Sequence, residues 1–264
     1  MSARPRAAGI AAILCEARLS GQALPVFPAP VPATLAEAYA VQRELCAALG
    51  RPVLGWKVGR IPPALVAELG TERLAGPVLR CVRLDGEAPG EARVFDGAAG
   101  AIEAEIMLRL TDVPRRRLTD NREARALIGE IRAGFEVASS PAPDVHDRAP
   151  FGIIADIGIN NGLLLGPELA AEDFDRDVAV EIDGARVGAG RACDVLDGPL
   201  GSVRFLVDLH HDRVIQLEPG QWVSAGAITG VHPIRPGQRA AATFGASHRI
   251  ACTAVAEPGV RSGS

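Results

Sequence analysis

The sequence has almost no lysine. Lys57, in the stretch LGWKVGR, is the only lysine among 28 basic residues, and all the others are arginines. Arginine keeps its proton at any physiological pH, whereas a lysine in a desolvated pocket can release one. A single lysine in an arginine-saturated chain therefore indicates a chemical role at residue 57. A plain salt bridge and a surface position are the alternatives.

Paired cysteines, excess basic charge and long apolar runs are also lacking. The five cysteines are an odd number without C-x-x-C spacing, which argues against a disulfide framework or a thiolate zinc site. The formal net charge of −4 argues against a nucleic-acid-binding surface. No apolar stretch approaches the ~20 residues that a membrane span needs. We therefore expect a cytoplasmic protein that binds neither nucleic acid nor a membrane.

Helical patterns begin the chain and short strands dominate the rest. The segment Ala7–Cys15 has one apolar helical face, a second helix is bounded by a capping box at Thr34 and by Gly50, and Pro25–Pro32 is a linker or wrapping arm between them. Further helices are expected at Pro63–Leu69, Asn121–Arg132, Phe151–Ile157 and Pro199–His210. Strands are expected at Val53–Val58, Val78–Leu84, Ile102–Leu110, Gly134–Ala138, Leu163–Leu165, Val178–Ile182, Ala185–Val187, Trp222–Ser224, Arg239–Phe244 and His248–Val255. This mixture predicts an α+β fold with an N-terminal part, residues 1–75, and a β-rich body, residues 76–264.

Three carboxylates stand out in apolar strand patterns. In AIEAEIMLRL the apolar residues take one face of a period-two strand, which places Glu103 and Glu105 together on the other face. Glu136 lies inside the apolar run AGFEVASS, where a lone buried carboxylate would cost several kcal/mol. A divalent cation relieves repulsion between neighbouring carboxylates, and oxygen ligands suit Mg²⁺ or Mn²⁺. A solvated outer face remains the alternative for the E-x-E pair.

The ordered set of motifs resembles a known family. The stretches GWKVG, IEAEI, FEVASS, IADIGINNGLLLG and VSAGAITGVHPIRPGQ are similar, in order and spacing, to those of the fumarylacetoacetate hydrolase superfamily. The resemblance is strongest to its branch of 2-keto-4-pentenoate hydratases and 4-oxalocrotonate decarboxylases, and it covers nearly the whole chain. It implies a fumarylacetoacetate-hydrolase-like mixed β fold, with a β-rich C-terminal body, flanking helices and a small helical N-terminal part.

The resemblance also implies roles for individual residues. The metal ligands of the family correspond to Glu103, Glu105 and Glu136, which would hold Mg²⁺ or Mn²⁺. The acid/base lysine of the family corresponds to Lys57. Asp156, in IADIG, corresponds to a family aspartate near the substrate, with a turn or cap role as the alternative.

Substrate contacts are expected at three further positions. Either Arg60 or Arg148 would hold a substrate carboxylate through a bidentate pair. Thr229 supplies the hydroxyl that remains in VSAGAITG. Apolar residues stand where the family is polar, at Leu74, Ile157, Ile159 and Ala227. The metal and lysine positions are thus kept while the residues that orient the substrate differ.

The leading expectation is a metal-dependent lyase of the 2-keto-4-pentenoate hydratase type, acting on a 2-oxo or 2-hydroxydienoic acid in aromatic-compound catabolism. A 4-oxalocrotonate-type decarboxylase is the first alternative and an acylpyruvate C–C hydrolase the second. A different class, a catalytically weak assembly subunit that binds metal and a small carboxylate, is motivated by the apolar substitutions. We expect a homo-oligomer, with a pathway enzyme as a further partner, and the arm Pro25–Pro32 is a candidate to reach a neighbouring subunit.

Overall fold

Two mixed sheets and a set of flanking helices form the structure. The computed structural model describes residues 3–84, 88–170 and 176–259. The helices are α1 (Ala3–Ser20), α2 (Leu35–Leu49), α3 (Pro63–Leu69), α4 (Asn121–Ala126), α5 (Phe151–Ala155) and α6 (Gly198–His211), with short 3-10 turns η1 (Val145–Arg148), η2 (Ile157–Ile159) and η4 (Ala192–Asp194). The strands are β1 (Gly55–Arg60), β2 (Arg73–Val78), β3 (Cys81–Arg83), β4 (Gly90–Val94), β5 (Ala99–Leu110), β6 (Ile128–Ser140), β7 (Asn160–Glu168), β8 (Asp177–Ile182), β9 (Ala185–Arg191), β10 (Trp222–Ser224), β11 (His232–Pro233), β12 (Arg239–Phe244) and β13 (His248–Ala256).

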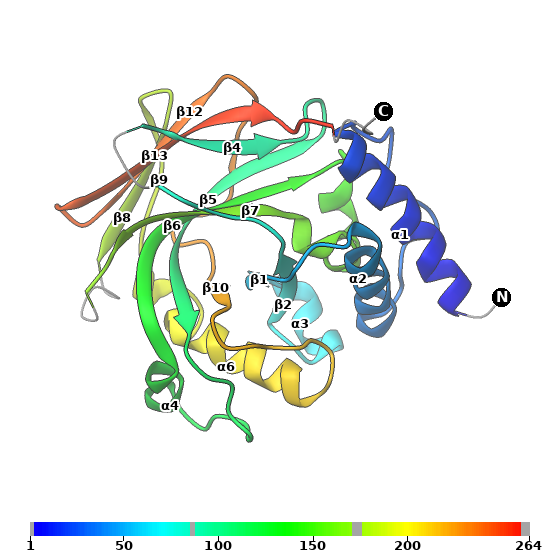
Figure 1. Ribbon diagram of the computed structural model, residues 1–264, viewed down its shortest axis with the longest axis horizontal. Coiled ribbons are helices and arrows are strands. Elements are labelled where there is room, and N and C mark those ends of the chain that lie inside the picture. The colour runs from blue at the N-terminus through cyan, green and yellow to red at the C-terminus, as the bar shows by residue number, and fades with distance from the viewer. Residues whose placement is uncertain (1–2, 85–87, 171–175, 260–264) are drawn as a thin grey trace.

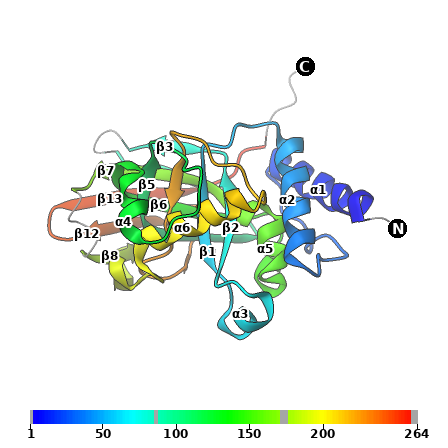
Figure 2. The same cartoon turned by 90° about the horizontal axis from the view of Figure 1, so that it is seen from below.

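The two sheets differ in size. Within the described residues an eight-stranded sheet has the order β2-β1-β10-β5-β6-β7-β3, with β11 pairing beside β5, and a five-stranded sheet has the order β4-β13-β12-β8-β9. Each contains parallel pairs, β1 with β10, β3 with β7 and β4 with β13, among antiparallel ones. Figures 1 and 2 show β8, β12 and β13 at the end opposite α1 and α2. The predicted α+β class is confirmed.

The largest core lies between the two sheets. The apolar face expected for residues 102–110 is part of it, since Ile102, Ala104, Ile106, Leu108 and Leu110 are all buried there. The same core contains residues of β6, which lies beside β5 in the same sheet, residues of β8, β12 and β13 in the second sheet, and the inner face of α6. A second core joins α1 and α2 to α5 and η2. The N-terminal helices therefore cover the sheet face that carries the candidate site.

The second helix has the ends that the sequence predicted. Thr34 Oγ1 accepts a hydrogen bond from the Glu37 amide at 3.2 Å, and Glu37 in turn accepts from the Ala33 amide at 2.9 Å. Gly50 ends the helix with a left-handed φ of 61°, which glycine adopts without the Cβ clash of other residues. The bond to Thr34 is that of a capping box, whereas the Glu37 carboxylate reaches the amide one residue before the N-cap.

The proline-rich arm packs on the chain itself. Phe27 is buried, and its amide donates to Asp144 Oδ1 at 2.6 Å. The Leu24 amide donates to the carbonyl of Pro141 at 2.8 Å. Both acceptors follow β6, so the arm joins α1 to the loop after that strand. A contact between this arm and a second subunit stays a prediction.

The helix expected at Asn121–Arg132 is too long. Helix α4 ends at Ala126, and β6 begins at Ile128, which pairs with Leu110 of β5. Ile131, Ala133, Phe135 and Val137 then alternate into the core with the period of a strand. The pairing with β5 overrides the helical pattern of residues 127–132.

Strands β2 and β4 carry no sequence signal. Every residue of β2 is buried, so the alternation that marks a half-buried strand is missing.

The expected boundary between residues 75 and 76 falls inside β2, and β1 and β2 belong to the same sheet as β5 and β6. The division into two parts stays a prediction.

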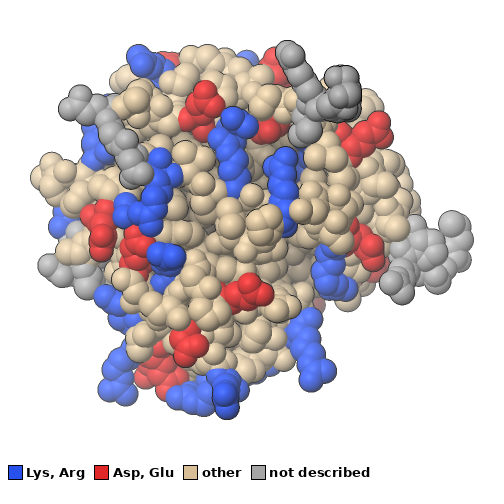
Figure 3. All heavy atoms as spheres, in the orientation of Figure 1, with Lys and Arg blue, Asp and Glu red and all other residues tan. Residues whose placement is uncertain are grey.

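The surface mixes charges of both signs. Figure 3 shows basic side chains interspersed with Asp and Glu over one face of the molecule, without a field of a single sign. Among the described residues, no helix has the length and apolar character needed to cross a membrane.

Candidate metal centre

Two central strands bring the three predicted carboxylates together. Strands β5 and β6 are antiparallel, with Glu103 directly opposite Glu136 and Glu105 opposite Gly134. Residues opposite one another on paired strands share a face of the sheet, so all three carboxylates project to the same side. One oxygen from each lies within 4.8 Å of the others. The chain therefore builds a compact oxygen cluster from residues that the sequence separates.

The cluster is buried and only partly hydrogen-bonded. Glu105 and Glu136 have no exposed surface, and Glu103 is 7% exposed. Glu105 Oε2 accepts from Ser224 Oγ at 2.5 Å and from the Gly226 amide at 2.9 Å. Within the part of the chain that the structure describes, Glu105 Oε1 and Glu136 Oε2 have no hydrogen-bond partner. Buried carboxylate oxygens without partners are costly, and these two are free to bind a cation.

Lys57 lies beside this cluster. It is on β1, where it pairs with Ser224 of β10, and its Nζ is 3.2 Å from Glu136 Oε1. Lys57 is 4% exposed, so its ammonium is held among carboxylates rather than by water. Three carboxylates and one ammonium leave an excess of two negative charges when all are ionised. A divalent cation would neutralise that excess.

Burial and mutual repulsion shift the pKa values of the cluster. Burial raises the pKa of Glu103 to about 7, and the charge of Glu136 adds to this while Lys57 opposes it. Burial likewise raises the pKa of Glu105 well above its usual range, with Glu136 and Glu103 adding to the effect. Without a metal, Glu103 and Glu105 are therefore easier to protonate than ordinary carboxyls, as expected for buried like charges in a shared site.

The pKa of Lys57 is also raised. Burial alone would lower it, but the charges of Glu136, Glu103 and Glu105 outweigh burial and hold the proton on Nζ. A bound cation would neutralise the carboxylates and so remove the cause of the raised lysine pKa.

Hard oxygen ligands fit the ions expected from the sequence. The donor set consists of carboxylate oxygens, two of them unpartnered, with no thiolate or imidazole in the cluster as the structure describes it. Such a set suits Mg²⁺ or Mn²⁺ better than softer metals. Glu103, Glu105 and Glu136 would hold the ion.

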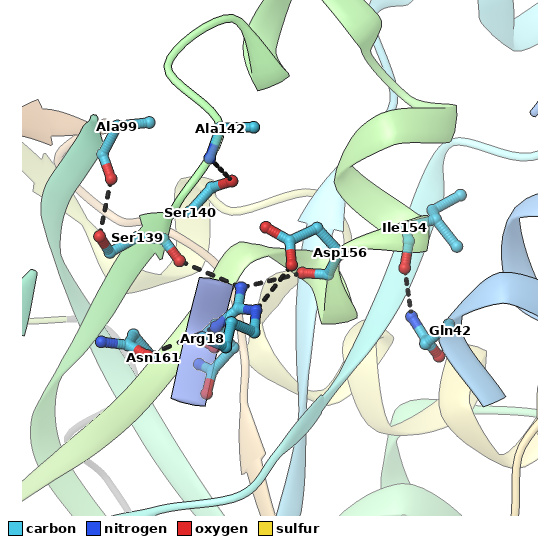
Figure 4. Close-up of polar contacts among 10 residues, drawn as sticks. Arg18, Gln42, Ala99, Ser139, Ser140, Ala142, Ile154, Asp156 and Asn161 are labelled. Carbon is cyan, nitrogen blue, oxygen red and sulfur yellow. Dashed lines mark hydrogen bonds and ion pairs between the residues drawn. The ribbon is translucent and has the colours of Figure 1, made fainter. Parts of the chain in front are cut away.

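Asp156 belongs to a different network. Its Oδ1 accepts from Arg18 Nε at 2.6 Å, and both side chains are buried. Figure 4 shows the Arg18 guanidinium surrounded by Asp156, Ser139 and Asn161. Asp156 also ends α5 and precedes η2, which matches the turn or cap role left open by the sequence. Its expected catalytic role stays a prediction.

The expected substrate contacts lie at varied positions. Arg60 is exposed at the end of β1. It is three residues after Lys57, so its side chain points to the face of the strand opposite that of Lys57. Arg148 is engaged by Asp144 Oδ2 at 2.8 Å. Thr229 follows Ile228, whose amide donates to the carbonyl of Ala104 on β5. The Thr229 hydroxyl is 3.0 Å from His232 Nε2. Of these, Thr229 lies beside the strand that carries Glu103.

The apolar substitutions in IADIGI form η2. Ile157 and Ile159 are buried with α1 and α2 in the second core, so their side chains contribute packing. Both have left-handed φ values, 49° and 54°, as does Gly158 between them at 68°. Left-handed backbone is costly for β-branched residues. The turn passes over Lys57, because a Cβ added at Gly158 would lie 3.0 Å from Lys57 Cδ.

Sequence reasoning missed the polar residues that bond to the carboxylates of the cluster and to Asp156. Arg18, Asn160 and Ser224 bond to Asp156, Glu136 and Glu105. Arg18 and Ser224 lie more than 100 positions from their partners, so no local spacing could pair them. Their only signal is burial of a polar side chain, which a single sequence does not reveal.

No family model matches the chain. It is 28% identical over 238 residues to a 4-oxalocrotonate decarboxylase of Pseudomonas sp., an alignment that covers 86% of this chain and 90% of the relative. The solved 4-oxalocrotonate decarboxylase from Pseudomonas putida G7, complexed with magnesium and adipate, superposes with a TM-score of 0.78 at 22% identity, covering 96% of this chain and 98% of that one. A yeast fumarylacetoacetate hydrolase family protein, ynq8, gives a TM-score of 0.52 at 16% identity, covering 77% and 93%.

These similarities confirm the resemblance to the fumarylacetoacetate hydrolase superfamily. The chain has the fold of its solved members, and the sequence similarity extends over most of the decarboxylase relative. The hydratase reading, placed first from the sequence, has no such support among these relatives.

Proposed function

We propose that this protein is a divalent-metal-dependent enzyme acting on a 2-oxo acid, and that its reaction is decarboxylation of the 4-oxalocrotonate type. The observation that carries the proposal is the buried cluster of Glu103, Glu105 and Glu136 with two unpartnered oxygens and Lys57 beside it. The similarity to a 4-oxalocrotonate decarboxylase supports the choice of reaction. Hydration of a 2-hydroxydienoic acid becomes the second candidate.

The metal and Lys57 would each contribute one part of the reaction. A bound Mg²⁺ or Mn²⁺ would polarise the oxygens of a 2-oxo carboxylate and stabilise the negative charge that develops there. Lys57 would hold, at Nζ, the proton that carbon acquires once the bond to the departing CO₂ has broken. Its contact with Glu136 at 3.2 Å fixes the position of that nitrogen.

Burial of the cluster supports the same reaction. Lys57, Glu105 and Glu136 are almost completely excluded from solvent, so charges in the site interact more strongly than they would in water. Exclusion of water also favours loss of CO₂ over addition of water to the same acid. We further propose that the enzyme works in the cytoplasm as a homo-oligomer in the breakdown of aromatic compounds.

The test is turnover with two acids. The purified protein, with Mg²⁺ or Mn²⁺, is given 4-oxalocrotonate or 2-hydroxypenta-2,4-dienoate, and CO₂ release is measured together with the loss of conjugated absorbance. We expect metal-dependent CO₂ release from 4-oxalocrotonate. Loss of absorbance from the dienoate without CO₂ release from either acid would instead establish the hydratase.

Variants then connect the activity to the site. Glu103→Gln is expected to weaken metal binding and turnover, and Lys57→Met to remove turnover while metal still binds. Glu91→Gln changes an exposed glutamate on β4 and is the matched control, expected to match the parent. Metal binding by the parent with no turnover of either acid would support the binding subunit and refute the enzyme.

A further inference from the structure

The side chain of Asn160 is held at both ends. It lies at the start of β7 and is 2% exposed. Its Oδ1 accepts from the Gly162 amide at 3.0 Å, and its Nδ2 donates to Glu136 Oε1 at 3.0 Å. An amide nitrogen cannot accept the Gly162 hydrogen, so the only orientation that satisfies both contacts presents Nδ2 to the carboxylate.

This bond makes the two oxygens of Glu136 unequal. Oε1 accepts from Asn160 Nδ2 at 3.0 Å and lies 3.2 Å from Lys57 Nζ. Oε2 is buried and has no partner among the residues that the structure describes. A carboxylate whose one oxygen is occupied by two donors can rotate only by losing both bonds. Its orientation toward the other carboxylates is therefore fixed.

We propose that Asn160 is a positioning residue for the metal centre. Its side-chain amide occupies Oε1 of Glu136, so that Oε2 is the atom that binds the cation. The inference rests on the metal site of the proposed function and adds a residue to which neither the motifs nor the comparisons assign a role. Groups that hydrogen-bond to metal-binding side chains typically change metal affinity by 10–100-fold when removed.

The surrounding chain explains why the donor comes from Asn160. The three residues of η2, which pass over Lys57, are Ile157, Gly158 and Ile159, and none has a polar side chain. The first residue after this turn supplies the amide instead. Arg18 Nη1 also donates to the Asn160 carbonyl at 3.5 Å, so α1 helps to hold the backbone from which the Asn160 side chain extends.

The experiment measures Mn²⁺ affinity directly. The electron paramagnetic resonance signal of free Mn²⁺ gives the dissociation constant for the parent, Asn160→Ala and Asn160→Ser, without any substrate. The serine hydroxyl is too short to reach Glu136 but can still accept from the Gly162 amide, so this variant keeps the local turn if alanine does not fold. Asn161→Ala is the matched control, because Asn161 Nδ2 donates to the Arg93 carbonyl and Glu257, both at 2.8 Å.

The expected result is a Mn²⁺ dissociation constant about tenfold higher for the Asn160 variants, and within about twofold of the parent for Asn161→Ala. A double-mutant cycle separates positioning from general loss of structure. With Glu136→Ala already present, Asn160→Ala should change the dissociation constant by less than about twofold, because the carboxylate that it positions is gone. A tenfold effect that persists in that background overturns the proposal.

The remaining outcomes are equally decisive. An Asn160→Ala dissociation constant equal to that of the parent overturns the positioning role. A parent that binds neither Mn²⁺ nor Mg²⁺ overturns both this inference and the proposed function. A parent that binds metal but turns over neither acid refutes the proposed function alone, and the affinity comparison still decides the role of Asn160.

Discussion

The Arg18–Asp156 pair is predicted to be a main support of the N-terminal helices. Arg18 Nε is 2.6 Å from Asp156 Oδ1, and the two side chains are 5% and 0% exposed. Arg18 Nη2 also donates to the carbonyls of Ser139 and Asp156 at 3.2 and 3.3 Å. Arg18→Met would leave the carboxylate and both carbonyls buried without these donors. Breaking a buried ion pair from one side typically costs 3–5 kcal/mol, so the free energy of unfolding should fall by about that amount.

Denaturant unfolding measures this loss, with an exposed pair as control. Arg117 lies 3.0 Å from Asp208 and also pairs with Asp212, but its side chain is 50% exposed, so solvent screens both contacts. Arg117→Met should therefore leave the unfolding free energy close to that of the parent. Adding Asp156→Asn to Arg18→Met should restore part of the loss, because the unpaired buried charge disappears. A loss below about 1 kcal/mol for Arg18→Met alone would refute the reasoning.

Three further predictions concern the metal centre, the contact of Gly76 with η2 and the buried hydrogen bonds of Gln42. Saturating Mg²⁺ or Mn²⁺, at about 100 times the dissociation constant, should stabilise the parent by about 2.7 kcal/mol, seen as a rise in Tm that Glu103→Gln loses; an unchanged Tm would contradict a metal site. Gly76→Ala should destabilise by about 1–3 kcal/mol in urea unfolding, because its Cβ would lie 2.5 Å from Gly158 Cα; a neutral Gly76→Ala would show that η2 can move. Gln42→Leu should cost about 1–3 kcal/mol in the same assay, since Gln42 Nε2 donates at 3.0 and 2.8 Å to two buried carbonyls, and a change below about 0.5 kcal/mol would contradict it.

Local patterns predicted most of the fold, but they failed where tertiary pairing decides the structure. The capping box at Thr34 and the alternation of residues 102–110 are local and were confirmed. The helix expected through Arg132 was wrong because Ile128 pairs with Leu110 on β5. Strand β2 was missed because both of its faces are buried, which removes the periodicity that a sequence can display.

The same distinction applies to the site. The carboxylates and Lys57 could be selected from the sequence because charged residues are conspicuous in apolar strands, and the structure brings them together. The hydrogen-bond partners Arg18, Asn160 and Ser224 could not be selected, because ordinary polar residues gain meaning only from the segments that pack against them. Register and packing, rather than residue type, place Asn160 and Ser224 beside the metal centre and Arg18 beside Asp156.

The single lysine can also be understood from the space around it. A Cβ added at Gly158 would lie 3.0 Å from Lys57 Cδ, and one added at Gly59 would lie 3.6 Å from Nζ. The narrow lysine stem fits this passage, whereas a planar guanidinium is wider and carries five donors that would need acceptors. Lys57→Arg would therefore test crowding and proton exchange together. Lys57→Met keeps an unbranched side chain and removes the ammonium, with its exchangeable protons, its charge and its contact with Glu136. Loss of turnover with retained metal binding in this variant would therefore point to a chemical role for the lysine.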